Sequence, residues 1–494
     1  MKTARQSRIL QRLPSPTWIL IAALGGILFA ITISKGVQDP DYFWHVTTGK
    51  LIATSGQVPS VDPFSFTWAG QPWTPHEWLS ELLIYALVST IGDVGALMVF
   101  GAFPAFIFAV LAYTLRQRRV RPLAIGVSCG VAAFVLVPYV TLRPQAVSWL
   151  LIAVLIGLLW GLRPERPRRV LLVVPLFVLW ANLHGLYVVG LGVLALFVLF
   201  TLIGRTQMGT ERRWVLGAGA GAVLASMLTP AGPIGILYPL RYINAGDWGL
   251  ENIQEWQSPN FHEPAHMGLL ILIIAVAING GRATPVWLAA LSYIGIAMSL
   301  LALRNAPVAA VFVVPTLAMG LSSRLEAWRP NGDRVVRPSL ALGRRVIEIV
   351  AAIAVLLAAW LVVLPPQPDA VVAAERSRRF PVAAVDRLSA VQPEARVLAE
   401  YGWGGYVIFR MYESGGRVFV DGRNDMYSEA ILNDYSAIRA ADRGWQDLVE
   451  SYGVDAMLFP PETTITRGPA LSEGWCEAYR DDEQVLYLRS CPSP

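Results

Sequence analysis

Residues 38–45 read Q-D-P-D-Y-F-W-H and follow directly on the first long apolar segment, residues 17–34. Two carboxylates, Asp39 and Asp41, and one imidazole, His45, therefore lie at or just outside a membrane surface. Ionisable groups at the rim of a bilayer are costly unless a polar cavity receives them. The next thirty residues, as far as His76 and Glu77, stay polar, aromatic and rich in proline. We interpret this stretch as the mouth of a polar cavity and the other segments as its walls.

The composition predicts a membrane protein. Of 494 residues, 54% are hydrophobic and only 15% are charged, whereas a soluble domain has about 25% charged residues. The isoelectric point near 9.1 is compatible with a nucleic-acid-binding protein. However, the basic residues occur in short clusters between apolar runs, which is typical of cytoplasmic loops. We therefore expect a lipid bilayer, and no nucleic acid, as the partner of this chain.

The three cysteines are too few for a disulfide framework. Cys129 lies in an apolar run, whereas Cys476 and Cys491 lie in the polar tail. One bridge between the last two is expected if the tail faces an oxidising compartment. The N-terminus has a basic region and an apolar run without a clear small-residue cleavage site, which predicts a retained signal anchor.

Apolar runs of about 20 residues predict the spans, and the bias of Lys and Arg between loops predicts their orientation. Eleven spans across the plasma (inner) membrane are expected, with the N-terminus in the cytoplasm. Residues 77–91 are apolar but short, and we expect a helix in the interface there. The predicted spans begin with 17–34, 94–115, 123–141, 146–162 and 170–181; the sixth ends near residue 204; then follow 214–228, 267–279, one ending at R-N-A-P (304–307), one ending near residue 323, and 346–364.

The distribution of basic residues agrees with this layout. The proposed cytoplasmic segments hold 22 of the 40 Lys and Arg residues, and the outer loops between spans hold five. The other 13 belong to the tail, which the eleventh span leaves outside. The sequence thus predicts a mostly α-helical polytopic domain, residues 1–364, with large outer loops at 35–92 and 229–266.

The tail, residues 365–494, is predicted to be a small extracytoplasmic α/β domain. β-branched and aromatic runs between glycine turns predict strands at R-V-L-A-E-Y, G-Y-V-I-F-R and R-V-F-V-D, and two closing strands at V-D-A-M-L-F and Q-V-L-Y-L-R. Apolar periodicity predicts helices at residues 428–441 and 445–452. The loop D-G-R-N-D (421–425) after a strand is either a binding loop or a turn stabilised by an Asp–Arg pair.

All five histidines fall on the outer side in this layout. Because the chain is expected to have loops on both faces of the membrane, such a one-sided distribution does not arise easily by chance. Histidine is a common proton shuttle and metal ligand, and together with acidic side chains it can build an acid/base or metal site. The alternative is that most are interfacial loop residues with ordinary hydrogen bonds. The candidate site residues on this face include His45, His76, His184, Asp39, Asp41, Glu77 and Glu255; His262 and His266 complete the histidines.

Three isolated arginines lie on the otherwise base-poor outer face: Arg143, Arg241 and Arg304. A guanidinium fork suits a phosphate or diphosphate group, so at least one is expected to bind a lipid phosphate. The alternative is that they reach the headgroups or cap helices.

Asp41 with Asp39 is the best catalytic pair. Burial near a membrane cavity can raise the pKa of a carboxyl, or the carboxylate can stay ionised against a divalent cation. If a metal binds, Asp39, Asp41 and His45 are its candidate ligands. Oxygen ligands favour Mg²⁺ or Mn²⁺, or Ca²⁺, and the histidine would admit Zn²⁺.

An outward first span, acidic residues after it, an interfacial helix and an outer C-terminal domain together resemble the GT-C superfamily of membrane glycosyltransferases, which includes protein O-mannosyltransferases and aminoarabinose transferases. More narrowly, a set of short motifs along nearly the whole chain resembles an uncharacterised bacterial branch of it. These motifs are D-P-D-Y-F-W-H, H-E-W-L, L-R-P-Q, N-L-H-G, R-N-A-P, W-G-G-Y and V-D-G-R-N-D-M-Y.

The resemblance implies a sugar donor linked to polyprenyl phosphate or diphosphate, and transfer outside the cytoplasm to a glycan, lipid or protein acceptor. The family's acidic residue after the first span corresponds here to Asp41, with Asp39 as the rival. The tail lacks the W-W-D-Y-G motif of oligosaccharyltransferases, which argues against N-glycosylation. No D-x-E pair stands in a second outer loop, which argues against a bound Mg²⁺ or Mn²⁺.

The sequence therefore predicts an inverting glycosyltransferase. In this mechanism Asp41 accepts the proton of the acceptor hydroxyl, and Arg304 or Arg143 stabilises the departing phosphate. Two other classes remain open: a transporter or flippase for a lipid-linked glycan, and a non-catalytic envelope-assembly protein. Charges confined to one face and the absence of a visible repeat weigh against a transporter.

Overall fold

The structure is a computed structural model that describes residues 16–238, 247–280, 284–327, 368–468 and 474–490. Arg241, the predicted eleventh span and Cys491 lie outside the described residues. Cys476 is disulfide-bonded, and Cys129 is a buried free thiol.

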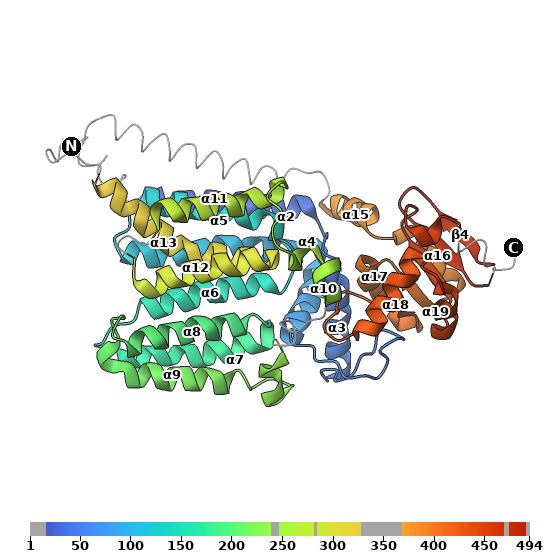
Figure 1. Ribbon diagram of the computed structural model, residues 1–494, viewed down its shortest axis with the longest axis horizontal. Helices are drawn as coiled ribbons and strands as arrows, with labels where there is room; N and C mark the ends of the chain where they lie inside the picture. The colour runs from blue at the N-terminus through green and yellow to red at the C-terminus, as the bar shows by residue number, and fades with distance from the viewer. Residues whose placement is uncertain (1–15, 239–246, 281–283, 328–367, 469–473, 491–494) are drawn as a thin grey trace.

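Apolar helices make up the N-terminal part of the chain and lie side by side in one bundle (Figure 1). Their sequences consist almost wholly of Leu, Val, Ile, Ala, Phe and Gly, so they can bury each other and face lipid. The helices are α2 (Pro16–Lys35), α4 (Trp78–Gln117), α5 (Pro122–Leu136), α6 (Gln145–Trp160), α7 (Val173–Leu183), α8 (Tyr187–Leu202), α9 (Arg212–Ala225), α11 (Met267–Asn279), α12 (Val286–Leu301) and α13 (Ala306–Ala327).

The chain is a membrane protein, and four segments of the described residues are long and apolar enough to cross a bilayer: Thr17–Lys35, Trp78–Gln117, Pro122–Tyr139 and Leu303–Ala327. Several other apolar helices have 16 residues or fewer, such as α6, α8 and α12. A helix rises about 1.5 Å per residue and needs about 20 residues to span the hydrocarbon core. The predicted count of eleven spans is therefore not reached among the described helices.

Helix α4 joins two segments that the sequence analysis separated. It includes the predicted interfacial helix and the second predicted span, and its backbone breaks at Gly92, where φ is 70° and ψ is 177°. Glycine adopts this conformation at little cost because it has no Cβ. The first part of α4 packs against α3 (Asp41–Ser55). Gly49 makes the close approach possible, because a Cβ there would lie 2.1 Å from the carbonyl oxygen of Glu81.

Helix α3 carries the D-Y-F-W-H motif and lies between the bundle and the C-terminal domain (Figure 1). Four consecutive side chains from Tyr42 to His45 are buried. Phe43 packs edge-to-face against Phe380 and Tyr406 of the C-terminal domain, with ring centroids 4.7 Å and 4.9 Å apart. A surface helix exposes one face, whereas residues 42–49 of α3 are buried on every side. This part of α3 therefore lies in the contact between the bundle and the C-terminal domain.

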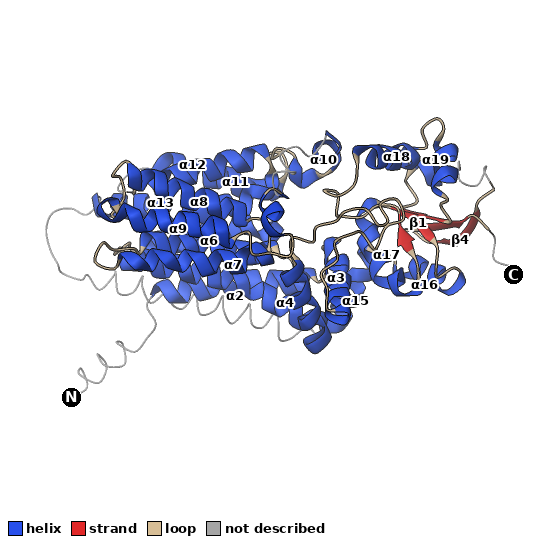
Figure 2. Cartoon of the chain, turned by 90° about the horizontal axis from the view of Figure 1, so that it is seen from below, coloured by secondary structure: helices blue, strands red, loops and turns tan. Residues whose placement is uncertain are grey.

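The C-terminal part is a small α/β unit with a five-stranded sheet in the order β2-β1-β3-β5-β4 (Figure 2). β1 pairs in parallel with β2 and β3, and β5 pairs antiparallel with β3 and β4. The strands are β1 (Arg396–Ala399), β2 (Arg417–Val418), β3 (Ala456–Phe459), β4 (Cys476–Arg480) and β5 (Val485–Leu488). The helices are α15 (Pro368–Arg379), α16 (Val382–Val391), α17 (Gly404–Met411), α18 (Glu429–Ala440) and α19 (Trp445–Tyr452).

One predicted strand of this domain is wrong. The run G-Y-V-I-F-R forms helix α17, although its residues have high strand propensity. Buried Gly404, Val407, Ile408 and Met411 recur at helical spacing, and Arg410 points to a partly exposed ion pair with Asp386. Gly404 and Met411 pack within the C-terminal domain, whereas Gly405, Tyr406 and Phe409 on the other side of the helix contact the start of α3. Packing on both sides outweighs the intrinsic preference, which is small and depends on context. Strands β1, β2, β3 and β5 and helices α18 and α19 lie where the sequence predicted them.

The loop between α3 and α4 extends the sheet of the C-terminal domain. The amide of Phe66 donates to the carbonyl of Val418 at 3.0 Å, and the amide of Val418 donates to the carbonyl of Phe64 at 3.1 Å. These bonds pair the loop in parallel with the edge strand β2. The pairing covers the edge of β2, which would otherwise expose unpaired backbone groups. The loop after α3 and the C-terminal domain therefore form one structural unit at the end of the bundle.

Candidate functional site

A cavity of about 190 Å³ lies between the bundle, the outer loops and the C-terminal domain. We call it the charged cavity, because acidic, basic and aromatic side chains from seven separate segments of the chain line it. Its lining residues are Pro40, Asp41, Trp44, His45, His76, Glu77, Arg143, Pro144, Gln145, Ile253, Glu255, Trp256, Arg304, Tyr401, Gly422, Arg423, Asn424 and Asp425. The structure thus brings together most of the residues that the sequence singled out.

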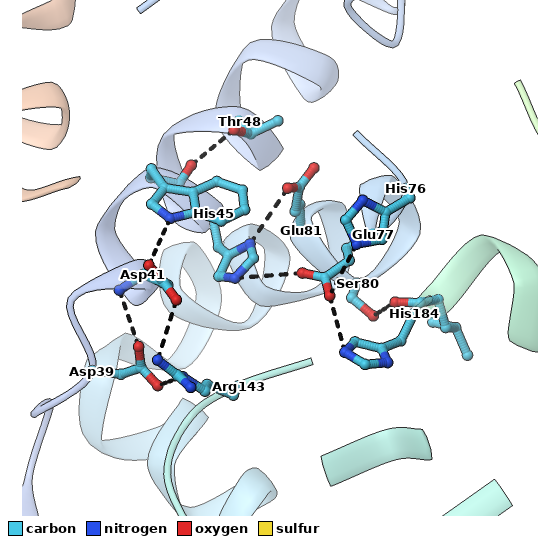
Figure 3. Close-up of polar contacts among 12 residues, drawn as sticks. Asp39, Asp41, His45, Thr48, His76, Glu77, Ser80, Glu81, Arg143 and His184 are labelled. Carbon is cyan, nitrogen blue, oxygen red and sulfur yellow. Dashed lines mark hydrogen bonds and ion pairs between the residues drawn. The ribbon is translucent and has the colours of Figure 1, made fainter. Parts of the chain in front are cut away.

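Arg143 binds three carboxylates at once. Its guanidinium forms ion pairs with Asp39 through Nε, with Asp41 through Nη2 at 3.2 Å, and with Glu255 through Nη1 at 3.0 Å. Figure 3 shows the first two of these contacts. Arg143 comes from L-R-P-Q, where Pro144 ends the loop and α6 begins. The three carboxylates raise the pKa of the arginine above its usual value despite its burial. Arg143 is therefore an anchor for the acidic groups.

The two rival aspartates have different surroundings. Asp39 is only 5% exposed and does not line the charged cavity; besides Arg143 it accepts hydrogen bonds from the Asp41 amide at 3.0 Å and the Thr141 hydroxyl at 3.3 Å. Asp41 lines the cavity. Trp44 Nε1 donates to its Oδ1 at 3.1 Å. Of the pair, Asp41 is the carboxylate that a ligand in the cavity can reach.

Burial raises the pKa of Asp41 to about 7. Arg143 and the Trp44 hydrogen bond act in the opposite direction, and the nearby Asp39 and Glu255 carboxylates add to the rise. A carboxyl with a pKa near neutrality can gain and lose a proton under physiological conditions, which is the property that general acid–base catalysis requires.

Glu77 is surrounded by three histidines. Its carboxylate lies 3.0 Å from His184 Nε2, 3.5 Å from His45 Nε2 and 3.6 Å from His76 Nε2 (Figure 3). Burial alone would raise the pKa of Glu77, but the histidines hold it below its usual range. Burial lowers the pKa of His45 to about 3. The group is thus an ionised glutamate that accepts a hydrogen bond from His184 and lies beside the other two imidazoles.

The hydrogen bonds of His184 fix its tautomer. Its Nδ1 accepts from the Leu186 amide at 3.1 Å and lies 3.0 Å from the Ser148 hydroxyl. That hydroxyl accepts from Trp180 Nε1 at 2.8 Å, so its own hydrogen is available for Nδ1. Nε2 therefore carries the hydrogen and donates it to Glu77. His184 does not line the charged cavity, and it acts on the site through Glu77.

In the part of the chain that the structure describes, Asp39, Asp41 and His45 are not grouped as the ligands of one metal ion. The guanidinium of Arg143 occupies the space among Asp39, Asp41 and Glu255, where a cation would bind them. Among the described residues, no three His, Cys, Asp or Glu side chains are placed to hold a metal ion. His45 contacts Glu77 and Glu81. The binding of Mg²⁺ or Mn²⁺ stays a prediction.

Other predicted residues are divided between the cavity and its surroundings. Arg304 lines the cavity, and its guanidinium lies 5.1 Å from the ring centre of Trp256. Arg241 lies outside the described residues. His262 and His266 do not line the charged cavity; the Nδ1 of His266 instead interacts with the backbone of Asn260. The five histidines therefore lie in two separate places, three at or beside Glu77 and two in the segment before α11.

The loop D-G-R-N-D (421–425) is a stabilised turn that lies at the charged cavity, and its role in binding stays a prediction. Arg423 pairs with Asp421 at 2.6 Å, as expected for a stabilised turn. Residues 422–425 also line the charged cavity. Asp425 is half-buried and accepts a hydrogen bond from the Tyr238 hydroxyl. Tyr401 and Trp256 were not singled out, because a single aromatic residue in a loop gives no sequence signal of its partner.

Gly422 provides a test of the contact between the C-terminal domain and Asp41. A Cβ at this position would lie 2.0 Å from Asp41 Oδ1, so Gly422→Ala must displace the carboxylate. A shift of about 1 Å at a catalytic group can lower a rate by about 10²-fold. We expect a loss of that order in the transfer rate, measured at saturating substrate, with normal folding. Gly402→Ala is the matched control, because a Cβ there meets no atom within 4 Å; equal rates for the two variants would contradict the contact.

No family model matches the chain, and no curated protein matches it. Among solved structures, the chain is similar to the arabinofuranosyltransferase AftD from Mycobacteria, with 14% sequence identity and a TM-score of 0.49. The match covers 97% of this chain and 40% of the AftD chain, so the chain spans about two fifths of the length of that protein.

Proposed function

We propose that this protein is a membrane glycosyltransferase that moves a sugar from a polyprenyl-phosphate-linked donor to an extracytoplasmic acceptor. The observation that carries the proposal is the charged cavity at one end of an apolar helix bundle, where Asp41, Arg304 and aromatic rings converge. A lipid-linked sugar is an amphiphile whose polar end needs such a cavity beside the bilayer. The proposal includes eleven spans, a cytoplasmic N-terminus and an outer C-terminal domain in the plasma (inner) membrane.

The proposed reaction is a single displacement at the anomeric carbon. Asp41 accepts the proton of an acceptor hydroxyl, and the oxygen attacks the anomeric carbon from the side opposite the phosphate. The bond between that carbon and the phosphate oxygen breaks, and the lipid phosphate leaves with the electron pair. Configuration is inverted because one displacement occurs. General-base assistance of this kind contributes about 10²–10⁴-fold.

Arg304 is the arginine proposed to stabilise the leaving phosphate. All three donor nitrogens of Arg143 face Asp39, Asp41 and Glu255, so a phosphate would have to displace a carboxylate from it. Arg304 lines the cavity, and its guanidinium carbon lies 5.1 Å from the ring centre of Trp256, a distance at which an aromatic ring attracts a cation. A positioned cation that faces developing negative charge lowers the barrier. Arg143 is assigned the role of fixing Asp41.

The remaining groups are proposed to bind the sugar. Trp44, Trp256 and Tyr401 supply aromatic faces, and Asn424 and Asp425 supply hydrogen-bonding oxygens and an amide from the C-terminal domain. The Tyr238 hydroxyl engages one oxygen of Asp425. A polar ring bound by a few oriented hydrogen bonds and aromatic walls fits the usual pattern of small-ligand sites. In this proposal the C-terminal domain completes the site.

The proposal is tested by transfer of label in membranes that express the full chain. Radiolabelled polyprenyl-phosphate sugars of several kinds are supplied one at a time, and the label that leaves the lipid fraction is counted. Release above that of membranes without the protein, with label recovered in a glycan, lipid or protein fraction, is expected for one donor. Movement of the intact lipid-linked sugar across the bilayer without release would instead identify a transporter. No change in either assay would favour an assembly role.

The pH dependence of transfer follows from the raised pKa of Asp41, about 7. A base must be deprotonated to act, so we expect the rate to rise with pH through about 7 and to level off above it. One unit below this value roughly a tenth of the groups is ionised. Glu77, with a lowered pKa, stays ionised in this range. Initial rates between about pH 5 and 9 measure this; a rate independent of pH would contradict Asp41 as the base.

A further inference from the structure

Two loops at the end of the bundle away from the C-terminal domain join α6 to α7 and α8 to α9 (Figure 1). Together with the helix starts that follow them, they carry far more arginine than acid. The arginines are Arg163, Arg166, Arg168, Arg169, Arg205, Arg212 and Arg213, and the acids are Glu165 and Glu211. The side-chain amide of Gln207 donates to the carbonyls of Leu159 and Leu162 at 3.2 Å and 3.4 Å, which ties the second loop to the end of α6. The arginines therefore share one surface, which we call the arginine face.

Little of this positive charge is neutralised within the protein. Among the described residues, only Arg213 of the arginine face forms an ion pair with a carboxylate, and its distance of 4.0 Å from Glu211 is at the limit of such a contact. Arg121, at the same end of the bundle, differs: it donates to the Leu325 carbonyl at 2.9 Å and pairs with Glu326 at 3.7 Å. Clustered like charges repel one another, so the arginine face favours an anion from outside the chain.

Two arginines of this face lie against one indole ring. The guanidinium carbons of Arg168 and Arg213 lie 5.2 Å and 5.7 Å from the ring centre of Trp214. Arg168 belongs to η2 (Pro167–Leu172) and Arg213 to α9, and η2 packs against α9. An aromatic ring within about 6 Å attracts a cation, and tryptophan is enriched where a membrane meets water. The ring therefore holds two cations together at the level of lipid headgroups.

Helix α9 presents an exposed apolar stripe that begins at these cations. Arg213 is followed at helical spacing by Leu216, Ala220 and Leu224, and residues three or four positions apart share one face of a helix. Leu216 is 44% and Leu224 is 64% exposed. From Arg213 to Leu224 the helix rises about 16 Å, and half of the hydrocarbon core of a bilayer is about 15 Å thick. The stripe thus matches the hydrocarbon of one leaflet.

The order of these groups is that of a phospholipid. A guanidinium fork suits the oxygens of a phosphate, and the stripe offers an acyl chain contact area without polar groups. A soluble anion, such as a nucleic acid or an acidic protein, would match the arginines but leave the apolar side chains beside them uncovered. Exposed apolar surface next to charged side chains marks contact with a membrane or a partner, and here the stripe continues the apolar surface of the bundle.

We propose that Arg168 and Arg213 bind the phosphate of an anionic phospholipid while an acyl chain of that lipid lies along Leu216, Ala220 and Leu224. The excess of arginine over acid selects a lipid with a net negative charge over a zwitterionic one. The site shares no residue with the charged cavity, and the inference does not depend on the proposed function. In the proposed orientation of the chain, the lipid belongs to the cytoplasmic leaflet.

The first experiment compares three ligands of the full chain, purified in detergent. Native mass spectrometry counts the protein molecules that retain phosphatidylglycerol, phosphatidylcholine, which has the same phosphate and an added cation, or glycerophosphoglycerol, which has the headgroup without acyl chains. Phosphatidylglycerol is expected to be retained well above the other two. Equal retention of phosphatidylcholine would contradict the selection by charge. Equal retention of glycerophosphoglycerol would show a site for a free phosphate group, and either result would overturn the proposal.

The second experiment removes the two cations and keeps the ring. The variant with both Arg168→Gln and Arg213→Gln is expected to bind phosphatidylglycerol about tenfold more weakly, the order expected for two basic side chains near a lipid surface. The matched control has both Arg387→Gln and Arg443→Gln, which remove the same charge from exposed positions of the C-terminal domain. Thermal unfolding checks that both proteins are folded. An unchanged affinity in the folded first variant, or an equal loss in the control, would overturn the proposal.

The third experiment locates the lipid and separates a bound one from ordinary bilayer contact. A phosphatidylglycerol with a diazirine in the middle of one acyl chain is incorporated into nanodiscs with the full chain, and labelled peptides are identified by mass spectrometry after irradiation. Label is expected within residues 213–224 and is expected to fall several-fold in the variant that lacks the cations of Arg168 and Arg213. Label in α9 that is equal in the two proteins would indicate bulk lipid alone and overturn the proposal. None of these readouts involves sugar transfer, so they are independent of the proposed function.

Discussion

Asp41→Asn is expected to lower the rate of sugar transfer by about 10²–10⁴-fold, which is the contribution of a general base. Asparagine has nearly the same shape, and its amide oxygen can still accept from Trp44 Nε1, which donates to Asp41 at 3.1 Å. It cannot accept the proton of an acceptor hydroxyl. Single-turnover rates with the donor that the transfer assay identifies, at matched expression, measure the loss. The rise of the rate with pH through about 7 should disappear together with the rate.

Two further variants make this result specific. Asp39→Asn is expected to have a smaller effect, because Asp39 is buried behind Arg143 and does not line the charged cavity. Asp482→Asn changes an exposed carboxylate of the C-terminal domain and should leave transfer unchanged. If Asp39→Asn abolished transfer and Asp41→Asn did not, the roles of the two aspartates would be exchanged. If neither had an effect, the proposed mechanism would be wrong.

The sequence allowed the location of the site to be predicted because local signals coincide there. The motif with Asp39 and Asp41 directly follows an apolar run, and a membrane rim makes such carboxylates expensive unless they are paired. Arg143 was notable because the predicted outer loops contain few other Lys or Arg residues. The structure joins these two signals in one ion-pair cluster. What the sequence could not give was the pairing itself, because 102 positions separate Arg143 from Asp41.

Local sequence patterns also could not predict that the C-terminal domain contributes residues to the charged cavity. Gly422 approaches Asp41 because the C-terminal domain packs on α3, and this packing depends on ring contacts such as Phe43 with Tyr406. No periodicity in either segment encodes the other. Packing also explains the wrong strand at α17, where contacts on both sides of the helix outweigh strand propensity. Long-range contacts thus account for both the missed cavity residues and the misassigned element.

The predicted number of membrane spans is limited by a different factor, the length of each helix. Hydropathy and charge bias indicate where apolar segments turn, and the described helices follow many of these turns. They do not determine how far each helix extends: α6 ends after 16 residues, and α4 runs through a break at Gly92 for 40. Helix length is set by packing and by turn residues such as this glycine, whose positive φ ends one helical segment and starts another.

Arg423→Leu is expected to lower the free energy of unfolding by about 3–5 kcal/mol, the usual cost of removing one partner of a buried ion pair. Arg423 is 2% exposed. Its Nη1 lies 2.8 Å from Asp62 of the loop between α3 and α4, and its Nη2 lies 2.6 Å from Asp421. The substitution would leave two buried carboxylates without their cation. It would also remove the guanidinium from the rings of Phe64 and Trp73, which lie 4.9 Å and 4.5 Å from it.

Because Asp62 and Asp421 belong to the two parts of the chain, this loss should also loosen the C-terminal domain from α3 and lower transfer through Asp41. Denaturant unfolding of the purified protein in detergent, followed by tryptophan fluorescence, measures the first effect. Arg439→Leu is the matched control: its pair with Glu400 at 2.9 Å is 46% and 22% exposed, and exposed pairs contribute about 0–1 kcal/mol. Arg423→Lys keeps the charge but not the two-pronged geometry, so its stability should fall between the other two. Equal stability of the Arg423→Leu and Arg439→Leu variants would show that the buried triad does not hold the two parts together. In that case Gly422 would have to be kept against Asp41 by the aromatic contacts of α3 alone.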